Sequence, residues 1–203
     1  MKKTISFVST IIPADQFKKK YEIGGSDNGE TITIYHLGEV LDSEIGAYRC
    51  YECSIPTPLF DEDEVKTAYV KFDEKVKAAE LAYVVSKKVE EITAYDKSDK
   101  VNGFVLNGLL VWLDKATRVG LMNSTTIAKA AGQETTTLWL GYVKLVVDCD
   151  KAIQLLSALE MYALECFNVT AAHKKAVSEL TSIEDVESYD YKKGYPEKLD
   201  MIV

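Results

Sequence analysis

Hydrophobic and polar positions alternate near the start of the chain, in residues 4–12, as is typical of a β-strand. Three segments are rich in β-branched and aromatic residues: 4–12, 30–36 and 47–55. Glycine-rich stretches over residues 24–29 and 38–46 lie between them and predict turns. Residues 1–60 are therefore expected to form a small β-rich unit.

In residues 61–96 the spacing of apolar residues becomes that of a helix. Asp61 is the predicted N-cap, and the acidic residues that follow it suit the positive end of a helix dipole. An apolar stripe with alternating steps of four and three consists of Val65, Tyr69, Phe72, Val76, Ala79 and Tyr83. Two interpretations fit this stripe: an amphipathic helix on its own domain, or a helix-to-helix contact between copies. The polar residues 97–100 predict a loop.

Residues 97–203 predict a compact domain that begins with a β-hairpin. Asn107-Gly108 lies between two apolar runs, and both residue types tolerate the positive φ that a tight hairpin turn requires. Asp114 is the predicted cap of a helix that extends to residue 131. Gly132 is expected to end that helix in the left-handed conformation.

A second hairpin and helix follow. Residues 135–147 are expected to fold back near Gly141, and Asp148 or Asp150 then begins a helix to about residue 180. The first half of this helix is apolar nearly all round, which predicts burial on several sides. A short helix capped by Ser182 comes next. The chain is thus predicted to be α+β, with an N-terminal β unit, a long connecting helix and a hairpin-helix-hairpin-helix domain.

Composition narrows the function classes. The 203 residues are 47% hydrophobic and 28% charged, which is ordinary for a globular protein. The net charge of −8 repels phosphate backbones, so nucleic acid is not an expected partner. A membrane is not expected either, because the sequence contains no run of about 18 apolar residues.

Residues of catalytic or metal-binding type do not form a recognisable motif. His36 and His173 lie far apart in the sequence, and neither has a neighbouring nucleophile. Cys50 and Cys53 have a metal-type spacing, but they lie within a predicted strand, where positions three apart face opposite sides. Cys149 and Cys166 do not complete a compact zinc site. We therefore predict no catalytic residues, no metal and no cofactor.

A few side chains are candidates for structural anchoring or for binding. Arg118 could form a salt bridge with Asp114 that joins hairpin to helix, or it could bind an anionic ligand. Trp112 and Trp139 are the other candidate anchors. The twelve tyrosines include a local cluster at residues 189–195, and tyrosine is enriched at protein interfaces.

The C-terminal 110 or so residues resemble an uncharacterised phage and prophage domain family. The resemblance is carried by Tyr95-Asp96-x-Ser98, Asn102-Gly103-Phe104, Leu106-Asn107-Gly108, residues 111–115, residues 117–121, Thr137-Leu138-Trp139, residues 156–164, Tyr189-Asp190-Tyr191 and residues 194–199. Members of that family often form the C-terminal part of tail- or fibre-associated proteins in phages and prophages of gut bacteria. No catalytic residue of the family is known to carry over.

The resemblance implies a non-enzymatic structural component or assembly factor of a tailed-phage virion, present in the virion or in the host cytoplasm during assembly. Its expected partners are other phage structural proteins and further copies of itself. The candidate self-interface consists of Val65, Tyr69, Phe72, Val76 and Tyr83. An alternative is a ligand- or carbohydrate-binding module, which would place Trp112 or Trp139 in a solvent-facing cleft.

Overall fold

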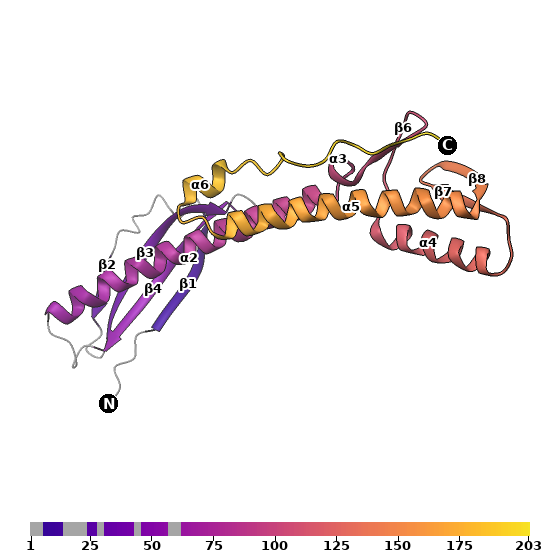
Figure 1. The fold of residues 1–203 in the computed structure, drawn as a ribbon. Coiled ribbons are helices and arrows are strands. Elements are labelled where there is room, and N and C mark those ends of the chain that lie inside the picture. Colours follow the sequence, from indigo (N-terminus) through magenta and orange to yellow (C-terminus); the bar gives the residue numbers. More distant parts are fainter. Residues whose placement is uncertain (1–5, 14–23, 28–30, 43–45, 57–61) are drawn as a thin grey trace. The chain divides into compact units, whose positions relative to one another are not determined.

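The computed structural model describes residues 6–13, 24–27, 31–42, 46–56 and 62–203. Helices and strands are both present, so the α+β prediction is confirmed (Figure 1). The chain forms two compact units, residues 1–84 and 85–203, which are called unit 1 and unit 2 below. The boundary between them falls inside the long helix α2 (Glu62–Asp96). Asp61, the predicted N-cap of that helix, lies outside the described residues.

Unit 1 contains a four-stranded antiparallel sheet with the strand order β1-β4-β3-β2. Its strands are β1 (Ser6–Pro13), β2 (Gly24–Asp27), β3 (Thr31–Asp42) and β4 (Ala47–Pro56). The predicted turn over residues 24–29 is wrong for its first four residues, which pair with β3 as an edge strand. Strand β3 also extends through most of the second glycine-rich stretch. Cross-strand pairing outweighs the weak strand preference of Gly24 and Gly25, whereas Gly38 lies in the register shift between Leu37 and Leu41.

In unit 1 the apolar stripe of α2 faces the sheet of its own unit. Phe72 and Val76 are buried, and the Arg49 guanidinium of β4 lies 3.9 Å from the ring centre of Tyr83. A self-interface at Phe72 and Val76 is therefore a wrong prediction, because their apolar surface is already covered within the unit. The interpretation of an amphipathic helix on its own domain fits these positions. The side chains of Val65 and Tyr69 lie outside the described part.

A buried carboxylate holds α2 to an irregularity in β3. The pairing of β3 with β4 shifts between Leu37 and Leu41, which leaves extra residues in β3. The Glu80 carboxylate accepts hydrogen bonds from the backbone N–H groups of Glu39 (3.0 Å) and Val40 (3.3 Å). Two amides at the bulge thus gain a charged acceptor from the helix, which is a strong type of hydrogen bond.

The predicted hairpin of unit 2 is formed by β5 (Phe104–Leu106) and β6 (Leu109–Val111). Asn107 and Gly108 have φ values of 50° and 80°, as the turn requires. Strand β9 (Asp200–Met201) pairs in parallel with β5, an addition that the sequence did not predict. The predicted loop over residues 97–100 is partly wrong: Ser98 caps a one-turn helix, α3 (Asp99–Asn102). The Ser98 hydroxyl accepts from the amide of Lys100.

The remaining elements of unit 2 follow the predicted order. They are α4 (Lys115–Ala130), the hairpin of β7 (Thr135–Leu140) and β8 (Val143–Asp148), α5 (Cys149–Ser178) and α6 (Ile183–Ser188). Helices α4 and α5 lie side by side (Figure 1). The core of the unit gathers buried side chains from the hairpins and α5, including Phe104, Leu106, Leu138, Leu140, Leu156 and Leu159. Among the described residues, no helix has the length and apolar character needed to cross a membrane.

Candidate functional site

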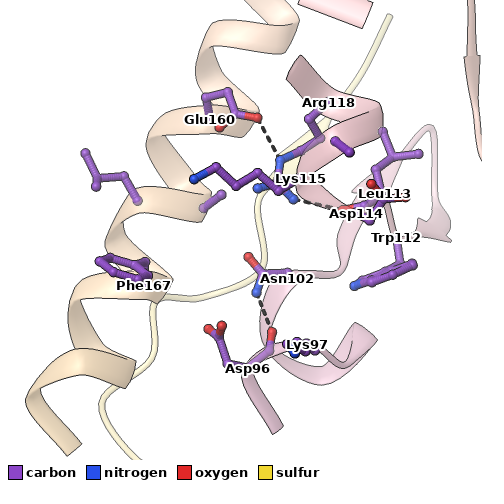
Figure 2. A pocket seen from close by; sticks show the side chains of 13 residues that line it. Asp96, Lys97, Asn102, Trp112, Leu113, Asp114, Lys115, Arg118, Glu160 and Phe167 are labelled. Atoms are coloured by element: carbon purple, nitrogen blue, oxygen red, sulfur yellow. Dashed lines mark hydrogen bonds and ion pairs between the residues drawn. The ribbon is translucent and has the colours of Figure 1, made fainter. Parts of the chain in front are cut away.

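A pocket of about 610 Å³ lies in unit 2 between α5 and the segment that runs from β6 into α4 (Figure 2). We call it the α4–α5 pocket. Its wall combines the end of α2, α3, the three residues after β6, the first turn of α4 and the middle of α5. Segments that are distant in the sequence therefore converge on one cavity, whose volume falls within the range of about 300–1,000 Å³ of ligand pockets.

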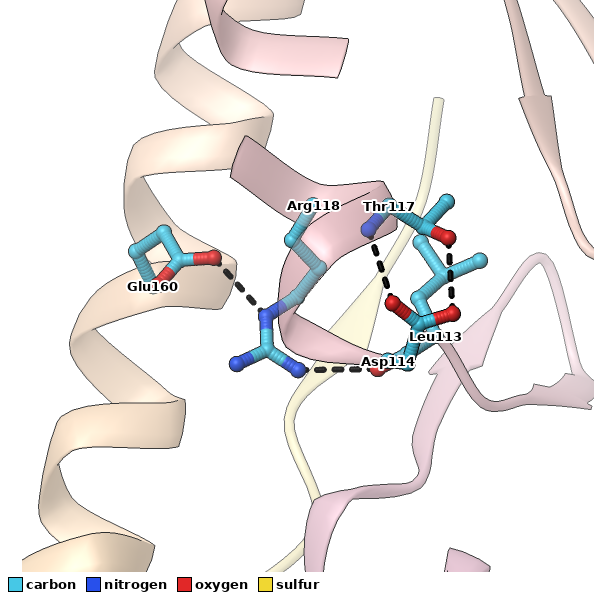
Figure 3. A network of polar contacts seen from close by, with 5 residues as sticks. All are labelled: Leu113, Asp114, Thr117, Arg118 and Glu160. Atoms are coloured by element: carbon cyan, nitrogen blue, oxygen red, sulfur yellow. Dashed lines mark hydrogen bonds and ion pairs between the residues drawn. The ribbon is translucent and has the colours of Figure 1, made fainter. Parts of the chain in front are cut away.

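Arg118 is the buried cation of this pocket, with 7% of its surface exposed. Its Nε donates to Glu160 Oε1 (2.8 Å), and its Nη1 donates to the carbonyl oxygen of Leu113 (2.8 Å) (Figure 3). Two directions of the guanidinium are thus occupied by α5 and by the residues after β6. The contacts fix the plane of the guanidinium, because its fork of donors is rigid.

The salt bridge expected of Arg118 is made with Glu160 on α5 and not with the neighbouring Asp114. The Asp114 carboxylate instead caps α4: Oδ1 accepts from the Thr117 amide (2.8 Å) and Oδ2 accepts from the Thr117 hydroxyl (2.7 Å). The backbone hydrogen bond from Thr117 is the main reason that the pKa of Asp114 lies below its usual value. Asp114 and Arg118 are nevertheless anchors, each with a partner that differs from the expected one.

The floor of the pocket is held by polar contacts between the end of α2 and its neighbours. Asn102 donates through Nδ2 to the carbonyl oxygen of Asp96. The Asp96 carboxylate accepts from the hydroxyl of Thr170 on α5 (2.8 Å), which also lies 3.0 Å from the hydroxyl oxygen of Tyr195. These contacts position the Asp96 carboxylate at the pocket.

Apolar side chains with much exposed surface form the other part of the wall. The exposed fractions are 41% for Trp112, 49% for Leu164 and 61% for Phe167. Figure 2 shows Trp112 on the β6–α4 side and Phe167 on the α5 side. Apolar rings beside charged groups can bind a ligand that has both an apolar body and a polar group.

The expectation that α5 is buried on several sides is wrong on one of them. Buried residues of α5 include Leu156, Leu159 and Cys166, whereas Met161, Leu164 and Phe167 are exposed. The spacing of three residues places the exposed set along one face of the helix. The apolar sequence around α5 therefore marks a core-facing side and a second side that is open to solvent.

Both tryptophans, which the sequence offered as candidate anchors or as binding residues, are exposed. Trp112 lines the pocket, while Trp139 on β7 is 57% exposed and lies outside it, with the Lys144 ammonium 6.0 Å from its ring centre. The tertiary structure thus separates the two candidate aromatic binding residues.

The histidine and the tyrosines near the C-terminal segment contact one another. His173 Nδ1 lies 2.9 Å from the Tyr189 hydroxyl oxygen, and Nε2 lies 2.8 Å from the carbonyl oxygen of Lys193. The Tyr95 ring packs edge-on against Tyr191 and Tyr195, with centroids 5.6 and 5.7 Å apart. This tyrosine cluster stabilises the fold within one chain, and its rings are half-buried. An interface role for these residues stays a prediction.

Cys50, Cys53, Cys149 and Cys166 are buried and unpaired with one another. Burial is the main cause that raises the pKa of the Cys50, Cys53 and Cys166 thiols, which suppresses the reactive thiolate. Within the described ranges, no group of three or more His, Cys, Asp or Glu residues could hold a metal ion. The side chain of His36 lies outside those ranges.

Sequence reasoning found Trp112, Asp114 and Arg118 but missed Asp96, Asn102, Glu160 and Phe167 as site residues. The signal for Phe167 was the excess of apolar residues on α5. No family model matches the chain, and no curated protein or solved structure is significantly similar to it.

Proposed function

We propose that this protein is a structural component or assembly factor of a tailed-phage virion, acting by association with other phage proteins. The observation that carries the proposal is the solvent-exposed apolar face of α5, formed by Met161, Leu164 and Phe167. Complete burial of one such side chain contributes about 1.5–3 kcal/mol. A partner that covers this face gains several kcal/mol, which gives the chain a strong tendency to associate.

The phage context depends on the resemblance of the C-terminal residues. Motifs that carry this resemblance include Asp96, Asn102, Trp112, Arg118 and Glu160, all of which line the α4–α5 pocket. Their convergence supports a role in which this part of unit 2 binds a partner. Self-association through the same exposed face of α5 replaces the excluded contact at the buried residues of α2.

The test compares two double variants of the whole chain during phage production. Leu164→Asp with Phe167→Asp places charges on the exposed face of α5. Val119→Asp with Ile127→Asp is the matched control, because these residues of α4 are also exposed but do not line the pocket. We expect wild type and control in particles or assembly intermediates, and loss of the α5 variant from both. Absence of the wild-type chain from both fractions would refute the proposal.

The mass of the purified chain in solution, measured by light scattering, tests self-association separately. We expect an oligomer for the wild type and a monomer for the Leu164→Asp, Phe167→Asp variant. A wild-type monomer would restrict the association to other proteins.

A second candidate function is ligand or carbohydrate binding, favoured by the exposed ring of Trp112 beside the polar groups of Asn102 and Asp96. Titration with neutral monosaccharides would then change tryptophan fluorescence in the wild type and in Trp139→Leu, but not in Trp112→Leu. No change in any of the three would rule out this candidate for those sugars.

A further inference from the structure

We propose that the α4–α5 pocket binds an acidic peptide segment of a partner protein, with a carboxylate near Lys97, Lys115 and Arg118 and an adjacent apolar side chain on Trp112 and Phe167. The inference depends on the proposed function and specifies the chemistry of the partner. It also gives Arg118 the second role that the sequence left open, anion binding, beside its ion pair with Glu160.

The charges of the pocket are formally balanced, but its carboxylates and its cations differ in the partners that this chain gives them. The lining contains three carboxylates, of Asp96, Asp114 and Glu160, and three cations, of Lys97, Lys115 and Arg118. Each carboxylate already accepts a hydrogen bond from a side chain of this protein: Thr170, Thr117 and Arg118, respectively.

The cations have donors to spare. Within the part of the chain that the structure describes, the ammonium groups of Lys97 and Lys115 make no ion pair or hydrogen bond, and Arg118 uses only Nε and Nη1. Figure 2 shows the Lys115 side chain extending from α4 toward α5. The pocket therefore offers positively charged donors that have no partner among the described residues, and an anionic acceptor complements them.

The start of α4 adds to this preference. Lys115 and Ala116, the first residues of this 16-residue helix, line the pocket. The backbone N–H groups in the first turn of a helix carry partial positive charge and favour a nearby anion. The Asp114 carboxylate already accepts from the Thr117 amide at this helix end, so the helix dipole contributes less than the side-chain cations.

The apolar wall indicates a peptide and not a free small anion. A carboxylate alone would leave Trp112, Leu164 and Phe167 exposed. A peptide that carries an aliphatic or aromatic residue beside its carboxylate covers these side chains as well, and it gains the burial energy that a free ion lacks.

Two matched peptides test this inference on the full chain: acetyl-Gly-Leu-Phe-Glu-Leu-Gly-amide and its twin with Gln in place of Glu. Sodium acetate is the small-anion probe. The chain has two tryptophans, so an NMR spectrum of the nitrogen-15-labelled protein contains two indole N–H signals. The signal of Trp112 reports on the pocket, and that of Trp139 is an internal control outside it.

We expect the Glu peptide to bind at least about tenfold more tightly than the Gln twin, which corresponds to about 1.4 kcal/mol. The shift of the Trp112 signal during titration gives both affinities. The Lys97→Gln, Lys115→Gln double variant should lose this difference, whereas Lys144→Gln, beside Trp139, should retain it. Both lysine substitutions remove exposed groups that lack hydrogen bonds in the described residues, so folding should be unchanged. Added salt should weaken binding of the Glu peptide.

Equal binding of the two peptides, or an unmoved Trp112 signal, would overturn the inference. Acetate that binds as tightly as the Glu peptide would also overturn it, because the site would then select a small anion. These outcomes differ from failure of the proposed function. Loss of the Leu164→Asp, Phe167→Asp variant from particles, without any preference for Glu, would leave association intact and reject only the acidic partner.

Discussion

Replacement of Arg118 by Met removes the guanidinium but keeps most of the apolar stem, so the loss of stability reports on its polar contacts. A hydrogen bond that involves a charged group contributes about 1.5–3 kcal/mol when it is buried. The bond to the Leu113 carbonyl is buried and takes the lower end of that range. The Glu160 side chain is 34% exposed, so solvent screening reduces its pairing with Arg118 to about 1 kcal/mol.

We therefore expect Arg118→Met to lower the free energy of unfolding of unit 2 by about 2.5 kcal/mol. Glu160→Gln should cost about 1 kcal/mol, because the amide oxygen still accepts from Nε but carries no charge. In the double variant the Glu160 substitution should add almost nothing, since its partner is already absent. The cost of the double variant should therefore be about 1 kcal/mol smaller than the sum of the two single costs.

Urea unfolding followed by tryptophan fluorescence is the suitable assay, because Trp112 and Trp139, the two tryptophans of the chain, both lie in unit 2. An unchanged dependence on urea concentration would show that the variants unfold in the same way. Strict additivity of the two substitutions would refute the argument, as would a cost of less than about 0.5 kcal/mol for Arg118→Met.

Three other predictions concern buried polar groups. Thr125→Val should raise the free energy of unfolding by about 1 kcal/mol in the same assay, because the buried Thr125 hydroxyl has no hydrogen-bond partner among the described residues. A lower free energy of unfolding would contradict this expectation. Gly38→Ala should cost unit 1 about 2 kcal/mol by circular dichroism, because the new Cβ would displace the Glu80 carboxylate, and this cost should nearly vanish in a Glu80→Ala background. Burial raises the pKa of Tyr51 from 10.0 to about 12, with the Glu80 charge as a further cause. The unfolded chain therefore releases this proton first, so the contribution of Tyr51 is complete below the unfolded pKa of 10.0 and is lost as pH rises toward about 12. As pH rises through this range, Tyr51→Phe should lose less free energy of unfolding than the wild type. Equal losses would contradict the assignment of this pH dependence to Tyr51.

Several elements of this protein depend on residues close together in the sequence, and these could be predicted. The β5–β6 turn needs two residues that tolerate positive φ, and Asn107-Gly108 supplies them. The cap of α4 needs an acceptor for a nearby amide, and Asp114 accepts from Thr117 three residues later. Gly132, with φ of 82°, ends the same helix. Such interactions satisfy the backbone locally, so composition and spacing suffice to predict them.

The partner of Arg118 could not be predicted in this way. Asp114 is a near neighbour in the sequence, but both of its carboxylate oxygens accept from Thr117. Glu160 is 42 residues from Arg118 and reaches it only because α4 packs beside α5. The parallel pairing of β9 with β5 likewise joins Val105 to Asp200. Contacts of this kind depend on how the elements pack, which local spacing does not encode.

The exposed face of α5 shows the same limit for burial. The apolar sequence determined that Leu156, Leu164 and Phe167 would favour removal from water, but it did not distinguish the side of the helix that a neighbour covers. Packing within unit 2 covers Leu156 and leaves Leu164 and Phe167 at the pocket. Hydrophobic side chains become core or binding surface according to the atoms that surround them, and only the tertiary structure places those atoms.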